Sequence, residues 1–261
     1  MIVRKSPAGS LTLIGQTDHS RFVGQLAAHW GNRDFATPAP YDSVVRAATY
    51  HDYGWLQYET RPLTNPETGE PYPFLGVPMT ERQLAGYQWA LDWMADIDPY
   101  SGLVVSMHRT GLWQGRYGKI KHPAGRYNLT ALSPEVQAFI THNEKRQQEL
   151  RGSVDAKGIG TNYRLMQVWD LLGLYFCCQE PYEDCIDPVP TGFGGEGRRM
   201  TMQPVGERKV RFDPYPFAEP RLRIQLSCKR LPERKYASAA EFRQAYFRAP
   251  NELLEYELLA A

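Results

Sequence analysis

The stretch Tyr50-His51-Asp52-Tyr53-Gly54-Trp55 places a histidine and an aspartate side by side at the end of a short, mostly apolar segment. Neighbouring positions on a helix point about 100° apart. The doublet can therefore hold one metal ion only if further ligands come from other parts of the chain. The sequence offers two more histidines and one more aspartate as good candidates: His19, His108 and Asp170. These five side chains predict one buried metal centre.

The first of these candidates, His19, lies in the first turn of a predicted helix, for which Thr17 or Asp18 is the expected N-cap. The helix carries apolar residues at core spacing: Phe22, Val23, Leu26, Ala27 and Trp30. Because His19 shares this stripe, we expect its side chain to point into the protein.

The other candidates also lie in apolar surroundings. Asp170 is in the middle of residues 163–178, which are hydrophobic on every face and predict a central helix. Residues 102–108, which end in His108, are apolar almost all round and should be buried. Burying an unpaired charge is expensive, so a buried aspartate marks an ion pair, a hydrogen bond or a metal. For Asp170 or His19 alone a hydrogen-bonded core side chain is the commoner case, and the whole set favours a metal.

The rest of the chain predicts a mainly α fold in a single domain over residues 1–261. Its helical, metal-binding core would span residues 16–180, and residues 181–261 would form a β-rich extension. Strands are expected from alternating or β-prone segments: residues 2–5, 11–15, 209–212, 221–229 and 253–259. The small β portion would form where the N-terminal hairpin pairs with the C-terminal strands.

Two helix starts and two irregular segments complete this outline. Thr80-Glu81-Arg82-Gln83 is a capping-box signature, and Ser133-Pro134 combines a cap with proline at the first helical position. Residues 59–78, rich in proline and glycine, predict a long surface loop that could cover a site. The prolines and glycines of residues 181–197 predict an irregular segment.

Composition bounds the function classes. The chain has 261 residues, 42% hydrophobic and 23% charged, and a net charge of +1, which argues against nucleic-acid or membrane-surface binding. We expect no membrane span and no secretory signal. The chain has four cysteines, Cys177, Cys178, Cys185 and Cys228. They make no paired CxxC spacing, which favours reduced thiols in the cytoplasm over a structural zinc. The sequence does not decide the oligomeric state, and a homo-oligomer stays open.

The order His19, His51-Asp52, Asp170 resembles the HD-domain superfamily, which is named for a His-Asp doublet on a helical core. A gap of 32 residues separates His19 from His51, and 118 separate Asp52 from Asp170, more than in minimal members. His108 resembles the additional histidine of members that hold two metals, and His122 and His142 are candidates for a further one.

The pattern also resembles an uncharacterised bacterial family of HD-like proteins over most of the chain. The segments that carry this resemblance are Gln16-Thr17-Asp18-His19-Ser20, His51-Asp52-Tyr53-Gly54-Trp55 and Ser106-Met107-His108. That family brings no known activity with it.

The superfamily resemblance implies a metal-dependent hydrolase of a nucleotide or another phosphate ester, that is, of a small molecule. His19, His51, Asp52 and Asp170 would hold the metal, and His108 would join a second ion or act as acid or base. Asp52 and His108 are the candidate catalytic residues. Imidazole and carboxylate ligands suit one or two ions of Mn, Fe, Ni, Co or Zn, and Mg would accept the carboxylates.

Asp18, beside a metal ligand, would orient it. The phosphate would meet a basic segment that follows His108: Arg109, Arg116, Lys119 and Lys121. For each of these cations taken singly, a solvated basic loop is the commoner explanation.

Two alternatives stay open at this point. Some HD proteins hold two irons and use oxygen to cleave carbon–carbon or carbon–phosphorus bonds, and His108 with His122 or His142 keeps this chemistry in play. The second alternative is a non-catalytic protein that binds a metal or a nucleotide. The intact ligand set argues against it, because a degenerate site would have lost a ligand.

Overall fold

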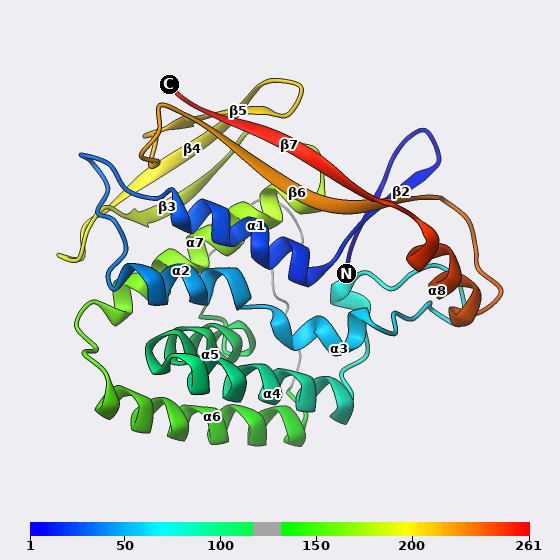
Figure 1. The fold of residues 1–261 in the computed structure, drawn as a ribbon, viewed down its shortest axis with the longest axis horizontal. Helices are drawn as coiled ribbons and strands as arrows, with labels where there is room; N and C mark the ends of the chain where they lie inside the picture. Colours follow the sequence, from blue (N-terminus) through cyan, green and yellow to red (C-terminus); the bar gives the residue numbers. More distant parts are fainter. Residues whose placement is uncertain (117–131) are drawn as a thin grey trace.

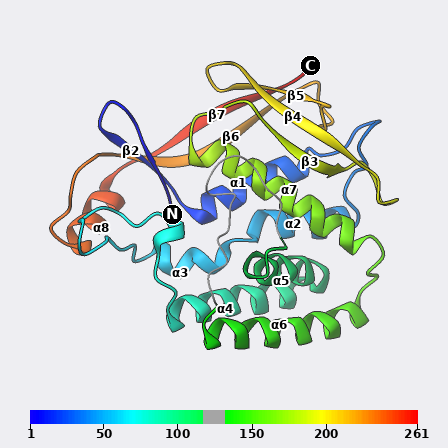
Figure 2. The same ribbon diagram turned by 180° about the vertical axis from the view of Figure 1, so that it is seen from behind.

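The computed structural model describes residues 1–116 and 132–261. Figures 1 and 2 show a long curved sheet that covers one side of a stack of helices. The helices are α1 (Gln16–Ala28), α2 (Tyr41–Tyr50), α3 (Leu56–Glu59), α4 (Glu81–Ile97), α5 (Pro99–Trp113), α6 (Pro134–Ser153), α7 (Ile159–Cys178) and α8 (Ala239–Arg248). Two 3₁₀ turns accompany them, η1 (Tyr53–Trp55) and η2 (Phe74–Gly76). None of these described helices is both long and apolar enough to cross a bilayer.

The sheet joins the two ends of the chain. Its strands are β1 (Ile2–Lys5), β2 (Ser10–Ile14), β3 (Asp184–Pro190), β4 (Gly197–Gly206), β5 (Lys209–Asp213), β6 (Arg221–Pro232) and β7 (Asn251–Ala260). They follow the order β1-β2-β6-β7-β5-β4-β3, and only the β5–β7 pair is parallel. The expected pairing of the N-terminal hairpin with the C-terminal strands is confirmed, because β2 pairs with β6 from Leu13↔Lys229 to Ser10↔Pro232.

The expectation of a mainly α protein is wrong. The described chain is 47% helix and 23% strand, and the curled seven-stranded mixed sheet is a major element of the fold. The irregular segment that the prolines and glycines of residues 181–197 predict is also wrong, because β3 and the start of β4 lie in it. Proline is tolerated in β3 because this strand lies at the sheet edge, where a missing N–H breaks no ladder. In β4, Pro204 lies at a register shift opposite β5, which is where an interior strand accepts proline.

The main core lies between the sheet and the helices on the far side of α7 in Figure 1, and α7 runs through it. As the sequence predicts, α7 is buried on nearly all sides, and Trp169, Tyr175 and Phe176 are fully buried. The ring centroid of Trp30, just after α1, lies 5.8 Å from that of Trp169 on α7 and 5.7 Å from that of Phe217 between β5 and β6, both edge-on. One aromatic cluster therefore joins α7 to the segments that follow α1 and β5. The helix that carries Asp170 is therefore held rigidly from several directions.

The helix starts are partly as expected. Thr80 accepts a hydrogen bond from the backbone N–H of Gln83 at 3.2 Å, and Ser133 likewise caps α6, so both predicted caps are confirmed. The cap predicted at Thr17 or Asp18 is wrong, because α1 begins at Gln16 after Gly15. The hydroxyl of Thr17 donates instead to the carboxylate of Glu59 at 2.6 Å.

Candidate metal centre

Four separate segments bring the five predicted ligands together. His19 comes from α1, the doublet follows the end of α2, His108 comes from α5 and Asp170 from α7, and these helices lie against one another in the stack (Figure 1). All five side chains are buried, and Asp52 is the most exposed of them at 9%. A buried group of three imidazoles and two carboxylates is costly unless its members pair with one another or with a cation.

Asp170 is the common neighbour of the three histidines. Its Oδ1 lies 2.7 Å from Nε2 of His19 and 3.4 Å from Nε2 of His51, while its Oδ2 lies 3.4 Å from Nε2 of His108. The ring centroids of His51 and His108 are 5.1 Å apart. The carboxylate therefore bridges three imidazoles that arrive from three directions.

The orientation of His51 is set by the end of its own helix. Its Nδ1–H donates to the carbonyl oxygen of Ala48 at 2.9 Å, which leaves Nε2 facing the cluster. This Nε2 lies 3.6 Å from Oδ2 of Asp52 and 3.4 Å from Asp170, both longer than a normal hydrogen bond. A ring held by a backbone carbonyl with its other nitrogen turned inward is typical of a metal-ligating histidine.

A glycine on α7 makes room for His19. A Cβ atom built at Gly173 would lie 2.5 Å from Cε1 and 2.9 Å from Nδ1 of the His19 ring. Gly173 is three positions after Asp170, so both face α1 on the same side of the helix. The absence of a side chain there lets the ring lie against α7 while its Nε2 reaches Asp170.

Within the cluster, the pKa values of His51 and His108 are shifted in opposite directions. Burial alone would lower the pKa of His51, but the carboxylates of Asp52 and Asp170 outweigh burial and raise it to about 9. Burial is the main cause that lowers the pKa of His108 to about 3; the attraction of Asp170 opposes this shift, and the charges of His51 and Arg109 add to it. Although burial opposes it, the hydrogen bond from His19 and the close approach of the His51 imidazole hold the pKa of Asp170 well below its ordinary value. At neutral pH the His51 side chain is thus protonated and the His108 side chain is neutral.

These residues fit a divalent metal by chemistry and by spacing. Two donors that are each about 2.1 Å from a metal, at a tetrahedral angle, lie roughly 3.4 Å apart. The separations of 3.4 to 3.6 Å around His51 match this spacing. Two triads have donor atoms within 4.8 Å of one another, namely His19, His51, Asp52 and His51, His108, Asp170. A bound cation would replace the proton of His51 as the positive charge of the cluster, and its binding would release that proton.

The predicted phosphate-binding cations that the structure describes lie in different environments. Arg109 is only 5% exposed, and its guanidinium lies 4.5 Å from the ring centroid of Tyr87 and 4.4 Å from that of Trp113. Arg116 is exposed and pairs with Glu144 at 3.3 Å, as a solvated basic residue does. Lys119 and Lys121 lie outside the described residues. Of the two described members, Arg109 and Arg116, the structure places Arg109 next to a predicted ligand, His108.

Of the two further histidine candidates, only His142 lies in the described part of the chain, and it is not in the cluster. His142 lies on the exposed face of α6, and His122 is outside the described residues. The structure instead brings in a carboxylate that sequence reasoning missed, Glu59 at the end of α3. Glu59 accepts hydrogen bonds from the backbone N–H of Gln16 and the hydroxyl of Thr17, so it anchors the start of α1 just before His19. No local pattern marks Glu59, because its partners lie more than 40 residues earlier in the chain.

Asp18 lies in the same corner of the protein as Glu59. A Cβ atom at Gly15 would lie 3.0 Å from Oδ2 of Asp18 and 3.1 Å from Oε1 of Glu59. Burial raises the pKa of both carboxyl groups. Asp18 also faces Arg21 at 3.6 Å. These contacts position the first turn of α1, and the expectation that Asp18 orients the His19 ring directly stays a prediction.

Comparison with known proteins gives a family but no activity. No curated protein matches the chain, and no solved structure matches it either. A family model described as a protein of unknown function, DUF3891, matches residues 1–233, which include all five clustered residues. Residues 234–261, which include α8 and β7, lie beyond this match. The chain therefore belongs to the DUF3891 family of proteins of unknown function.

Proposed function

We propose that the His–Asp cluster binds one or two divalent transition-metal ions and that the protein hydrolyses a small-molecule phosphate ester. The observation that carries the proposal is the convergence of five buried donors from four segments, with donor separations near those around a metal. Mn, Fe, Co, Ni or Zn suits this donor set, and Mg suits its carboxylates. The similarity to the HD-domain superfamily belongs to this proposal and supplies the reaction class.

The roles of the residues follow from their environments. When bound, the metal supplies a Lewis acid that activates water and neutralises phosphoryl charge. His19, His51, Asp52 and Asp170 would hold it. His108 stays neutral at physiological pH, which is the form in which an imidazole ligates a metal, so it would hold a second ion. A pKa of about 3 makes it a weak base, which disfavours the acid–base role. Arg109, fixed between two aromatic rings beside His108, would bind a phosphoryl oxygen.

The diiron alternative has one observation in its favour. The two triads share His51, which is an arrangement able to hold two ions close together. Iron content and oxygen consumption would separate this chemistry from hydrolysis. Two irons per chain with oxygen uptake would favour the oxygenase, whereas one non-redox metal with phosphate release would favour the hydrolase.

The first experiment is metal analysis by mass spectrometry on protein purified without a metal-affinity tag. We expect stoichiometric metal in the parent, retention in the control His142→Ala, and loss in His51→Ala and Asp170→Ala. A phosphate-ester panel with the identified metal then tests turnover. Protein that contains no metal and takes up none of Mn, Fe, Co, Ni or Zn would overturn the proposal. Metal binding without turnover on the panel would favour the non-catalytic alternative.

The four cysteines bear on the cellular location that we propose. All four are free thiols in the structure: Cys177, Cys178, Cys185 and Cys228. Free thiols persist in a reducing compartment, so their state supports the cytoplasm as part of this proposal.

A further inference from the structure

A surface pocket of about 280 Å³ lies where α3, the N-terminal end of α4 and α8 meet. Three arginines line it, and each comes from a different segment: Arg61 after α3, Arg82 at the start of α4 and Arg243 on α8. Figures 1 and 2 show the loop that follows α3 running beside α8. The lining includes no aspartate or glutamate, and none of the three arginines forms an ion pair with any residue in 1–116 or 132–261.

The rest of the pocket combines an apolar wall with the polar side chains of Gln57, Thr80 and the buried Gln83. Tyr58 is 8% exposed, and Leu63 and Val77 line the pocket with it. Gln83 is 6% exposed and is held by a hydrogen bond from its Nε2 to the carbonyl oxygen of Gly54 at 3.4 Å. The positive end of the α4 dipole also lies here, because Arg82 and Gln83 belong to the first turn of this 17-residue helix. The guanidinium groups and the helix dipole favour an anionic group, and the apolar wall favours an apolar group on the same ligand.

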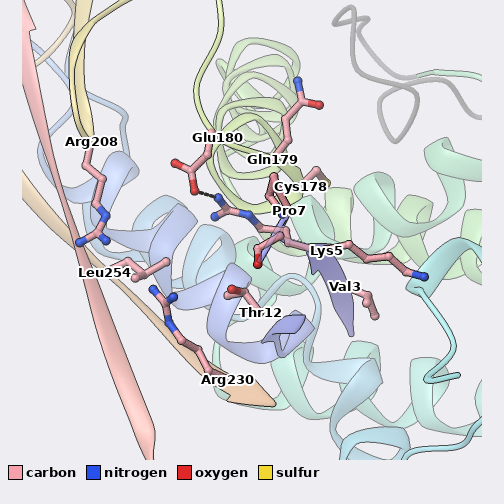
Figure 3. A pocket seen from close by; sticks show the side chains of 12 residues that line it. Val3, Lys5, Pro7, Thr12, Cys178, Gln179, Glu180, Arg208, Arg230 and Leu254 are labelled. Carbon is pink, nitrogen blue, oxygen red and sulfur yellow. Dashed lines mark hydrogen bonds and ion pairs between the residues drawn. The ribbon is translucent and has the colours of Figure 1, made fainter. Parts of the chain in front are cut away.

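A second pocket, shown in Figure 3, is the natural comparison. It has about 260 Å³ and also contains several cations, and Arg208 and Arg230 extend on either side of Leu254. Each of its cations has a carboxylate partner: Arg4 with Glu180, Lys5 with Glu70 and Glu233, Arg208 with Glu207, and Arg230 with Glu252. It also adjoins the C-terminal end of α7, whose dipole repels anions. The positive charge of that pocket is thus compensated, and the charge of the α4 pocket is not.

We propose that the α3/α4/α8 pocket binds a small organic anion that carries a phosphoryl head group and an apolar body. A guanidinium matches the oxygens of a phosphoryl group with paired hydrogen bonds, and three of them suit a dianion. The volume lies just below the roughly 300 to 1,000 Å³ of ordinary small-molecule sites, so the ligand is about the size of one substituted ring. None of the five clustered histidines and aspartates lines this pocket, and the proposal does not depend on metal binding.

Calorimetric titration with phenylphosphonate, which has no ester bond to hydrolyse, tests the proposal on the full chain after metal removal with a chelator. We expect saturable binding at one site, weakened at least about tenfold in Arg82→Gln and in Arg243→Gln, because one charge-assisted hydrogen bond contributes this much. The control Arg230→Gln removes the same charge from the compensated pocket and should bind normally. Inorganic phosphate should bind more weakly than phenylphosphonate, because it leaves the apolar wall unused.

The outcomes separate this site from the metal centre. His51→Ala should keep phenylphosphonate binding even if it loses metal. Absence of saturable binding would overturn the proposal, as would equal weakening in Arg230→Gln, which would indicate a net-charge effect. Thermal unfolding of each variant checks that replacing an arginine, of which Arg243 is half-buried, leaves the fold intact.

Discussion

Gly173 offers the sharpest test of the geometry around His19. A Cβ atom at this position would lie 2.5 Å from Cε1 of His19 and 2.5 Å from Cγ2 of Val23. We predict that Gly173→Ala forces the His19 ring away from α7 and out of line with Asp170. Gly160, on the same helix, is the matched control, because a Cβ atom there would meet nothing within 4 Å.

The magnitude follows from the contact. To restore an ordinary separation of 3.4 Å from 2.5 Å, the ring must move by about 0.9 Å. Overpacking of this kind costs about 1 to 3 kcal/mol, while alanine in place of glycine within a helix contributes up to about 1 kcal/mol. Gly160→Ala should therefore raise the free energy of unfolding by up to about 1 kcal/mol. The free energy of unfolding of Gly173→Ala should lie about 1 to 3 kcal/mol below that of Gly160→Ala, because only Gly173→Ala introduces the close contact with His19 and Val23.

Two measurements check this prediction. Urea denaturation of the metal-free proteins gives the difference in the free energy of unfolding. Titration with Co²⁺, followed by its visible absorption, gives metal affinity, which should fall about 10-fold to 100-fold in Gly173→Ala only, because ligand placement tolerates little displacement. If both variants gain equal stability and bind Co²⁺ alike, then His19 does not lie against α7 as described, and our account of the site is refuted.

Three further predictions concern the surrounding fold. Although burial opposes it, hydrogen bonds hold the pKa of Asp98, the cap of α5, below its ordinary value of 3.8; Asp98→Asn should cost about 1 to 2 kcal/mol at pH 7. Because the folded-state pKa is the lower one, the stability that Asp98 contributes is present above pH 3.8 and is lost as the pH falls through the folded-state value. Urea curves that show the same stability difference between the parent and Asp98→Asn at pH 7 and well below pH 3.8 would contradict this. Asn162→Ala removes hydrogen bonds to the carbonyl of residue 39 and to the Tyr100 hydroxyl, at 2.7 and 2.6 Å, and should cost about 2 to 3 kcal/mol by urea denaturation; a cost no larger than that of Tyr100→Phe would count against it. Burial raises the pKa of Cys178 to about 12 and that of Cys177 well above its ordinary value, so a thiol reagent at pH 8 should label both only after unfolding, and rapid labelling of the native protein would argue otherwise.

Local chemistry made several features readable from the sequence. The hydroxyls of Thr80 and Ser133 mark where α4 and α6 begin, because a cap is satisfied within three residues. The all-round apolar pattern of α7 indicated its central place, and a buried aspartate within it required partners. For the same reason, the five members of the cluster could be named in advance, although their metal stays a prediction.

Other features depend on contacts between distant segments. The prolines of β3 and β4 read locally as breaks, and only an edge position and a register shift make them compatible with strands. Glu59 shows no periodic signal, since its meaning lies in its hydrogen bonds to the start of α1. Arg61, Arg82 and Arg243 are ordinary surface residues until three segments place them around one pocket.

The sequence by itself therefore determined which side chains must be buried and satisfied. His19 and Asp170 are 151 residues apart, and a pattern of hydrophobicity cannot say that their side chains meet at 2.7 Å. That meeting depends on the packing of α1 against α7 at Gly173. Hydrophobic burial is non-directional and can be seen in composition and period, whereas the angles and distances of a polar cluster are decided only when the helices pack.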